Sequence, residues 1–439
     1  MLEVRNKLIL MNFLQFAVWG VYLTSMGNYL SSINLASKIG LFYAMQGIVS
    51  IFMPTLLGII ADRWIPAQRL LGYAHLLAGV FIIGAGYYGM VSGSGVSFNT
   101  LFLLYTLSIL FYMPTIGLSN SVSYYSLSSK GLDITKHFPY IRIFGTIGFI
   151  VGMLMVNFLG FENGELKLSF ANNTNFNSFQ NNYNQFFLSG ILSLLLFIYS
   201  FALPYCPVKN NSEKRSLANT LGLRAFNLFK DRNTVVFFIF SMFLGVSLQI
   251  TNGYANPFIS SFKDIPEYAS SWGTHNANAL ISLSQISETL CILLIPFVLK
   301  KYGIKIVMLM AMVAWSLRFG LFAIGNPSSG IVFFVLSMIV YGIAFDFFNV
   351  SGSIYIDSKT STEMRSSAQG IFMMMTNGLG ATIGMLGAQA VVNHFVFTNH
   401  TATEQLKGWQ ISWTIFALYA LIIAILFGFL FKYKHQKNN

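Results

Sequence analysis

The stretch LSMIVYGIAFDFFNVSGS, residues 336–353, places a carboxylate, Asp346, in the middle of an apolar run. A second stretch, SQISETL at residues 284–290, places Glu288 inside another such run. An ionised acid near the centre of a bilayer costs about 3 kcal/mol even on lenient insertion scales, so such an acid indicates a substrate path or a proton relay. These two carboxylates are therefore the first candidates for function.

The composition predicts an all-α membrane protein. Of the 439 residues, 55% are hydrophobic and 9% are charged, against about 25% charged residues in an average soluble domain. A helix needs about 20 apolar residues to cross a hydrocarbon core. Twelve runs meet this need, at about residues 8–30, 40–61, 70–91, 99–125, 140–160, 184–204, 234–257, 277–299, 304–325, 330–353, 366–392 and 409–432. We expect no cleaved signal peptide and no disulfide framework, since Cys206 and Cys291 fall at or within spans.

The distribution of basic residues predicts the orientation of the chain. The net charge is +12. When the spans alternate across the membrane from a cytoplasmic N-terminus, 20 of the 26 Lys and Arg residues fall in the tails and even-numbered loops. This asymmetry is the positive-inside rule, and it predicts cytoplasmic N- and C-termini in a cell (inner) membrane. Basic residues spread in this way do not form a nucleic-acid-binding patch.

Two composition changes divide the chain. A polar segment at 205–233 predicts a cytoplasmic linker between a six-helix bundle at 1–204 and a second one at 234–439. An Asn-rich segment from Phe161 to Gln185 is expected to be a mobile external loop. Two six-helix bundles joined by a cytoplasmic linker fit the major facilitator superfamily, in which the halves rock about a central site.

The loop after the second span supports this architecture. GIIADRW, residues 58–64, resembles the loop signature of that superfamily. We expect Gly58 to permit close helix contact and Asp62, beside Arg63, to take part in gating. The alternative is an ordinary charged helix end at the lipid headgroups.

Four sets of polar residues within spans each share one helical face. They are Gln249 with Asn252, Gln285 with Glu288, Asp346 with Asn349, and Arg142 with Thr146 and Phe149. Amides suit nucleobase edges and sugar hydroxyls, and an aromatic face such as Phe345 can stack a flat ring. The inventory therefore fits a flat, uncharged, polar ligand.

Each set also has a structural interpretation. Polar side chains join transmembrane helices to one another, and the two acids could form ion pairs with Arg142 or Arg318. Arg318 itself is expected to brace helices or to reach for the interface. We expect His75 to be a packing residue with one hydrogen bond, and most phenylalanines of the span around Asp346 to be packing as well.

Longer strings resemble the nucleoside:proton symporter family of the major facilitator superfamily. The strings are FLQFAVWG (13–20), FMPTLLGIIADRW (52–64), YMPTIGLSNSVSYY (112–125), FPYIRIFGTIGFI (138–150), FFIFSMFLGVSLQITN (237–252), SQISETL (284–290), LSMIVYGIAFDFFNVSGS (336–353), SAQGIFMMMTNGLG (367–380) and FKYKH (431–435). The resemblance implies a binding cavity formed by Arg142, Thr146, Gln249, Asn252, Gln285, Glu288, Phe345 and Asp346.

The resemblance also implies an activity, which is proton-coupled uptake of purine or pyrimidine nucleosides, or both. Asp346 is our first choice for the coupling acid, and Glu288 would bind the substrate and share the proton. We expect no cofactor and no metal, because the proton gradient supplies the energy, and we expect a monomer. The alternatives are a carrier of sugars or other small polar solutes, an uncoupled nucleoside facilitator and, more remotely, a membrane receptor or enzyme.

Overall fold

The computed structural model describes residues 2–170, 176–208, 228–360 and 365–433. Within it the chain divides into two compact units, residues 1–214 and 215–439. Most of the predicted linker at 205–233 lies outside the described residues, so its boundaries stay a prediction.

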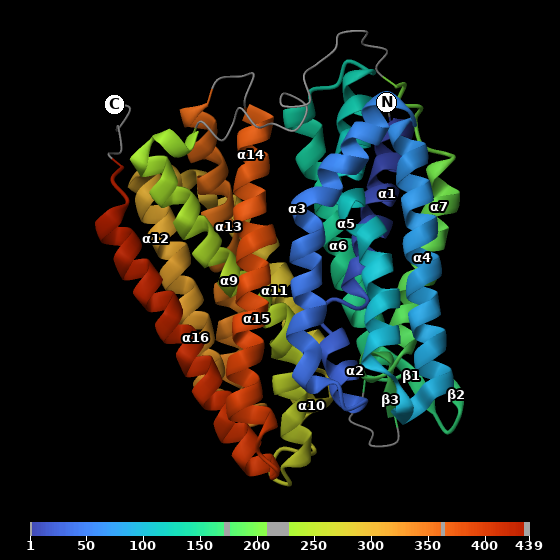
Figure 1. Ribbon diagram of the computed structural model, residues 1–439, viewed down its shortest axis with the longest axis vertical. Helices are drawn as coiled ribbons and strands as arrows, with labels where there is room; N and C mark the ends of the chain where they lie inside the picture. Colours follow the sequence, from blue (N-terminus) through green and yellow to red (C-terminus); the bar gives the residue numbers. More distant parts are fainter. Residues whose placement is uncertain (1, 171–175, 209–227, 361–364, 434–439) are drawn as a thin grey trace. The chain divides into compact units, whose positions relative to one another are not determined.

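Unit 1 is a bundle of long apolar helices (Figure 1). Its helices are α1 (Leu2–Gly20), α2 (Met26–Ser32), α3 (Ile39–Arg63), α4 (Ala67–Ser92), α5 (Phe98–Ser128), α6 (Ile134–Phe158) and α7 (Asn184–Ser200). The first predicted span is interrupted, because α1 ends at Gly20 and a turn separates it from α2.

Unit 2 is also helical. Its helices are α9 (Arg232–Ser261), α10 (Trp272–His275), α11 (Ala277–Cys291), α12 (Ile295–Ile324), α13 (Ile331–Lys359), α14 (Arg365–Met373), α15 (Ala381–Val392) and α16 (Ala402–Leu430). Two π-helical stretches, Met374–Gly380 and Asn393–Phe397, flank α15.

Helices occur at each of the twelve predicted spans, and nine helical segments of the described residues are long and apolar enough to cross a membrane. One of the nine, Ala277–Ile324, has 48 residues and would be about 72 Å long if it were straight. It is broken at Gly303, whose φ is 75°, so it accounts for two predicted spans. Helix α1 carries charges near its start and α7 has 17 residues, so twelve complete crossings stay a prediction.

Each unit contains helices whose backbones touch. In unit 1, a Cβ at Gly148 of α6 would lie 2.1 Å from the carbonyl oxygen of Phe13, and one at Gly20 of α1 would lie 2.2 Å from that of Phe149. In unit 2, a Cβ at Gly245 of α9 would lie 2.2 Å from the carbonyl oxygen of Thr376 in the first π-helical stretch. Only glycine permits such an approach, because any side chain would force the helices apart.

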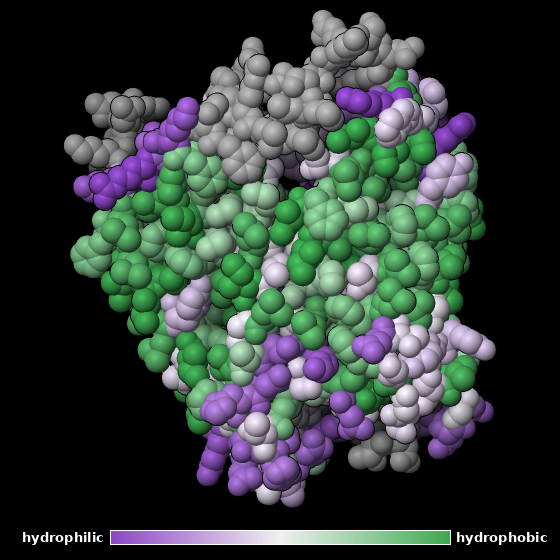
Figure 2. Space-filling model, in the orientation of Figure 1, coloured by the Kyte–Doolittle hydropathy of each residue, from purple (hydrophilic) through white to green (hydrophobic). Residues whose placement is uncertain are grey.

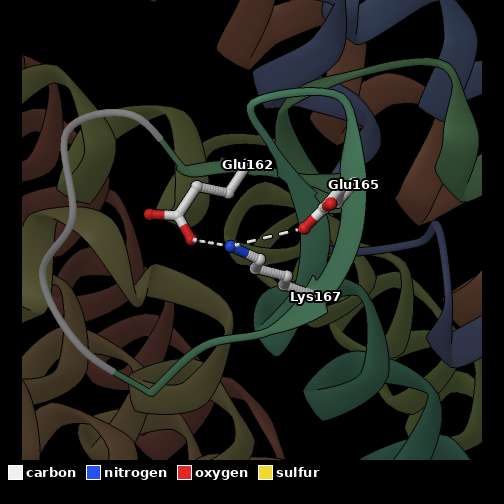
Figure 3. Close-up of polar contacts among 3 residues, drawn as sticks. All are labelled: Glu162, Glu165 and Lys167. Carbon is white, nitrogen blue, oxygen red and sulfur yellow. Dashed lines mark hydrogen bonds and ion pairs between the residues drawn. The ribbon is translucent and has the colours of Figure 1, made fainter.

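The segment predicted as a mobile loop is partly a β-sheet, so that prediction is wrong for these residues. Strands β1 (Leu159–Glu162), β2 (Glu165–Leu168) and β3 (Phe176–Ser178) form an antiparallel sheet in the order β2-β1-β3. Asn163 and Gly164 have φ values of 52° and 84°, as a two-residue hairpin turn requires. Lys167 Nζ lies 3.1 Å from Glu162 across the hairpin and 3.8 Å from Glu165 on its own strand (Figure 3).

The surface carries the signature of a membrane protein. On the face shown in Figure 2, hydrophobic residues cover the middle of the helices and hydrophilic residues gather toward their ends. Large apolar side chains such as Leu103, Ile198 and Phe429 are more than half exposed. A soluble protein would bury such residues, whereas lipid solvates them.

Candidate functional site

The predicted amide pair forms a contact on α9. The Asn252 side-chain nitrogen donates to Gln249 Oε1 over 2.7 Å, as their spacing of three residues allows. Gln249 is buried and Asn252 is half-buried. The contact leaves the Gln249 amide nitrogen as a donor and the Asn252 carbonyl oxygen as an acceptor for a ligand.

The two acids are carried by helices that pack closely together. A Cβ at Gly342 of α13 would lie 2.5 Å from the carbonyl oxygen of Ser287 on α11, and the Ser287 hydroxyl donates to the carbonyl oxygen of Ile339. Glu288 follows Ser287 directly, and Asp346 lies one helical turn beyond Gly342. The packing of α11 on α13 therefore holds both carboxyl groups in one region of unit 2.

Tyr341 of α13 lies near both acids. Its hydroxyl interacts with the Gln285 side chain and lies within electrostatic range of both Glu288 and Asp346. Tyr341 and Asp346 are buried, whereas Gln285 and Glu288 are half-buried. Four polar side chains from two helices thus form one cluster.

The aromatic residues of α13 have different surroundings. Phe347 and Phe348 are buried, and the Phe348 ring stacks on Phe237 at 6.2 Å. Phe345 is half-buried and stacks on Tyr341 with ring centroids 5.6 Å apart. Of the three, Phe345 is the least buried, and its contact with a ligand stays a prediction. The Asn349 amide donates to the backbone of Phe345 over 3.0 Å.

A small hollow adjoins Phe345. Its lining comes from α9, α12, α13 and the first π-helical stretch, and consists of Leu244, Gly245, Leu248, Trp315, Phe345, Asn349 and Thr376. Of the predicted binding residues, this lining includes Phe345 but neither member of the amide pair.

Arg318 of α12 braces helices, which was one of the two roles expected from the sequence. It is 1% exposed, and its Nη1 donates to the carbonyl oxygen of Ser337 over 2.8 Å and to the Ser284 hydroxyl over 3.3 Å. Its guanidinium carbon lies 4.5 Å from the centre of the Tyr341 ring. Within the described ranges its partners are thus a carbonyl, a hydroxyl and aromatic rings, and the alternative of an ion pair between Arg318 and either acid is not seen there.

The predicted stripe on α6 faces α1. The Arg142 guanidinium lies 4.0 Å from the centre of the Phe16 ring, and the Phe149 ring meets Trp19 edge to face at 6.1 Å. Arg142 and Thr146 are half-buried, whereas Phe149 is 7% exposed. Phe149 consequently offers less surface to a ligand than the prediction implied.

The predicted gating residues lie at the end of α3. Asp62 and Arg63 are exposed in its last turn. The reason given for Gly58 is wrong, because open space surrounds the position where its Cβ would be. The gating role of the three residues stays a prediction.

A buried polar network in unit 1 escaped the sequence analysis. His75 Nδ1 lies 2.9 Å from Ser193 Oγ, and His75 Nε2 lies 2.8 Å from Gln15 Oε1, so His75 has two partners rather than the one predicted. Gln15 in turn donates to Thr115 over 2.7 Å. This network, Gln15–His75–Thr115–Ser193, joins α1, α4, α5 and α7. Its members are separated by tens of residues, so no local spacing could reveal it.

Comparison with known proteins identifies the family. The nucleoside H+ symporter family matches residues 2–436. Two Escherichia coli (strain K12) proteins, the nucleoside permease NupG and the xanthosine permease, are each 42% identical to the chain over 99% of its length and over 98% and 97% of their own. The putative nucleoside transporter YegT from the same organism is 30% identical over 98% of the chain and 94% of its own length.

Solved structures agree with this assignment. A crystal structure of the nucleoside transporter NupG matches with a TM-score of 0.84 and 41% identity, covering 98% of this chain and 100% of that one. The POT family transporter PepTSo matches with a TM-score of 0.67 at 13% identity, covering 98% and 97% of the two chains, which is a likeness of fold alone. The chain has the major facilitator fold and belongs to the nucleoside H+ symporter family.

Proposed function

We propose that the chain imports nucleosides together with protons, and that the residues described above bind both. The relatives that span its whole length are named for nucleosides in general and for xanthosine, a purine nucleoside. The observation that supports the assignment to residues is the close packing of α11 on α13 in unit 2. Gly342 meets the backbone of Ser287, which directly precedes Glu288, and Asp346 lies one turn beyond Gly342.

The chemistry of the candidate binding residues suits a nucleoside. The Gln249 and Asn252 amides offer a donor and an acceptor to a base edge or a ribose hydroxyl, and Gln285 with Glu288 offers a second polar pair. Phe345 offers a ring face on which a base can stack. In unit 1, Arg142 and Thr146 supply further polar groups from α6.

The coupling follows from the cost of charge in an apolar setting. A carboxylate at membrane depth is expensive, and protonation removes that cost. Asp346, which is 4% exposed, takes the coupling proton, and Glu288 shares it while contacting the substrate. The loaded carrier converts to its inward-open state, and release into a less acidic cytoplasm resets it.

We further propose a monomer in the cell (inner) membrane with both termini in the cytoplasm. The distribution of basic residues supports this orientation. Lys167→Cys and Lys301→Cys test this orientation. Both positions are exposed, and the orientation predicts that they lie on opposite sides of the membrane. Cys206 and Cys291 are buried and give little background labelling. An impermeant thiol reagent added to intact cells should label Lys167→Cys but not Lys301→Cys. Labelling of Lys301→Cys but not Lys167→Cys would show that the orientation is the opposite of the proposed one.

Uptake into proteoliposomes tests the function. Radiolabelled uridine, adenosine and xanthosine are offered with and without an imposed pH gradient, acidic outside. We expect accumulation above the external concentration that disappears when a protonophore collapses the gradient. Accumulation unaffected by the protonophore would make the protein a facilitator. Competition by sugars, but not by nucleosides, would reassign the substrate.

A further inference from the structure

Three side chains of unit 2 form a continuous stack that leads from the helix core to the candidate site. The Arg318 guanidinium carbon lies 4.5 Å from the centre of the Tyr341 ring. The Tyr341 ring lies 5.6 Å from the Phe345 ring at an interplanar angle of 11°. Trp315 closes one edge of the stack, with its ring perpendicular to Tyr341 at 5.9 Å. Phe345 is the member of the stack that also lines the hollow.

Hydrogen bonds fix the buried end of this stack from two sides. Arg318 Nη1 donates to the carbonyl oxygen of Ser337, and the Ser337 hydroxyl donates back to the carbonyl oxygen of Arg318 over 3.0 Å. Arg318 also donates to the Ser284 hydroxyl, which itself donates to Met338 Sδ over 3.0 Å. The guanidinium therefore joins α12 to α13 and to α11.

The helix positions that Arg318 holds are those next to the site. Ser284 directly precedes Gln285 and lies one turn before Glu288. Ser337 lies one turn before Tyr341, which in turn lies one turn before Phe345. A shift of Arg318 would thus be transmitted to both the polar face of α11 and the aromatic face of α13.

We infer that Arg318 and Tyr341 are positioning residues that fix the ring plane of Phe345 and hold it ready for a flat ligand. This inference rests on the proposed function, because it gives that function a source of affinity. A preorganised ring loses less conformational freedom when a base stacks on it. The guanidinium is suited to the role because it is planar, always charged and able to donate several hydrogen bonds while it stacks.

Nucleoside binding and transport kinetics of Arg318→Met test the inference. Met retains length and apolar character but loses the charge and the donors. We expect the dissociation constant for radiolabelled uridine or adenosine to rise about tenfold, while turnover at saturating substrate stays within about threefold. Arg318→Lys keeps the charge without the plane and should recover part of the affinity. Arg318→Met with wild-type affinity would overturn the inference.

A double-mutant cycle separates positioning from general damage. In a Phe345→Leu background the ring to be positioned is gone, so Arg318→Met should weaken binding by less than about twofold. A full tenfold loss in that background would show that Arg318 acts by another route and would overturn the inference. If Arg318→Met does not fold, Tyr341→Leu interrupts the same stack, with Tyr341→Phe as its reference because that variant loses the same hydroxyl but keeps the ring. Relative to Tyr341→Phe, Tyr341→Leu should show the same loss and the same coupling to Phe345.

Lys305→Met is the matched control. Lys305 also lies on α12 and also braces a neighbouring helix, since its Nζ donates to the carbonyl oxygen of Gly428 on α16 over 2.8 Å. Its removal should leave nucleoside affinity within about twofold of wild type, and a tenfold loss would mean that any brace on α12 matters equally. A wild-type protein that binds no nucleoside would instead refute the proposed function itself.

Discussion

The two units repeat one packing device and differ in the chemistry of their buried polar groups. In unit 1 the backbones of α1 and α6 meet at Gly20 and Gly148, and in unit 2 the backbone of α9 meets the π-helical stretch at Gly245. Unit 1 buries a network around His75, and unit 2 buries the charged residues Arg318 and Asp346.

This difference separates scaffold from chemistry. Close contacts at glycine bring helices together in either unit, so they belong to the architecture. A network of an imidazole, an amide and hydroxyl groups can be satisfied without net charge. Asp346 can gain or lose a proton, so its charge at membrane depth changes with protonation, whereas the Arg318 guanidinium stays charged. The coupling proton proposed above would therefore be carried in unit 2.

The largest expected effect comes from Asp346→Asn. This change removes the titratable group but keeps its size, so the accumulation ratio of nucleoside should fall to about one, the value for passive equilibration. Uptake driven by a pH gradient measures it. His75→Gln in unit 1 is the control and should retain accumulation. Accumulation that survives Asp346→Asn but is lost in His75→Gln would contradict the proposed difference between the two units.

The glycine contacts come next. Gly148→Ala in unit 1 and Gly245→Ala in unit 2 each place a Cβ closer than 2.5 Å to a backbone oxygen, so each should lower stability by about 1–3 kcal/mol. Gly117→Ala and Gly387→Ala have open space around the new methyl group and should be neutral or stabilising by up to about 1 kcal/mol. Thermal melting in detergent compares the four. Equal effects at all four positions would mean that close approach is not the cause.

His75→Leu probes the network of unit 1. It leaves the Gln15 and Ser193 side chains without their partner, which should lower stability by about 2 kcal/mol. The substrate dependence of uptake should stay unchanged, because none of these residues is a predicted ligand contact. His75→Gln should restore part of the melting temperature. A change in proton coupling upon His75→Leu would place proton chemistry in unit 1 as well.

The smallest effect concerns the cap of α9. Hydrogen bonds from Thr234, one of them 2.6 Å long from its hydroxyl, hold the pKa of the Asp231 carboxyl below its ordinary value. Asp231→Ala should cost about 1 kcal/mol at neutral pH. Because the pKa is lower in the folded state, this contribution is complete above the pKa of the unfolded chain and is lost as pH falls through the folded one.

Melting curves of wild type and Asp231→Ala at neutral and acid pH check the sign. Asp231→Asn keeps a side-chain acceptor at the cap but not the titratable group, and should show no such pH dependence. A difference between wild type and Asp231→Ala that grows toward acid pH would contradict the assignment.

Much of the helical fold was predictable, because membrane spans can be recognised from the length and hydropathy of apolar runs. The interruption after Gly20 and the β-sheet at 159–178 were missed for different reasons. The sheet had a local signal, the turn Asn163-Gly164 flanked by alternating apolar residues, which the abundance of asparagine obscured. The break in α1 had none, because the surrounding sequence stays apolar.

The candidate site was predictable only as helical faces. Spacing correctly paired Gln249 with Asn252, since three residues nearly complete a turn. Spacing could not reveal Tyr341, because in a span rich in aromatic residues its hydroxyl is a single polar atom without a periodic partner. The loop signature at 58–64 suggested a close contact at Gly58 that is not found among the described residues. Which helix a face meets is decided by tertiary packing, which a single sequence does not encode locally.

The π-helical stretch Met374–Gly380 has a geometric consequence. Figure 1 shows α14 and α15 as one rod, and this stretch lies between them. A wide turn holds one more amino acid than an ordinary one, so everything beyond it is rotated by about 100° relative to an uninterrupted helix. Deleting a single residue there would rotate α15 by about 100°. A different face of α15 would then meet α9, although the residues of α15 themselves would be unchanged.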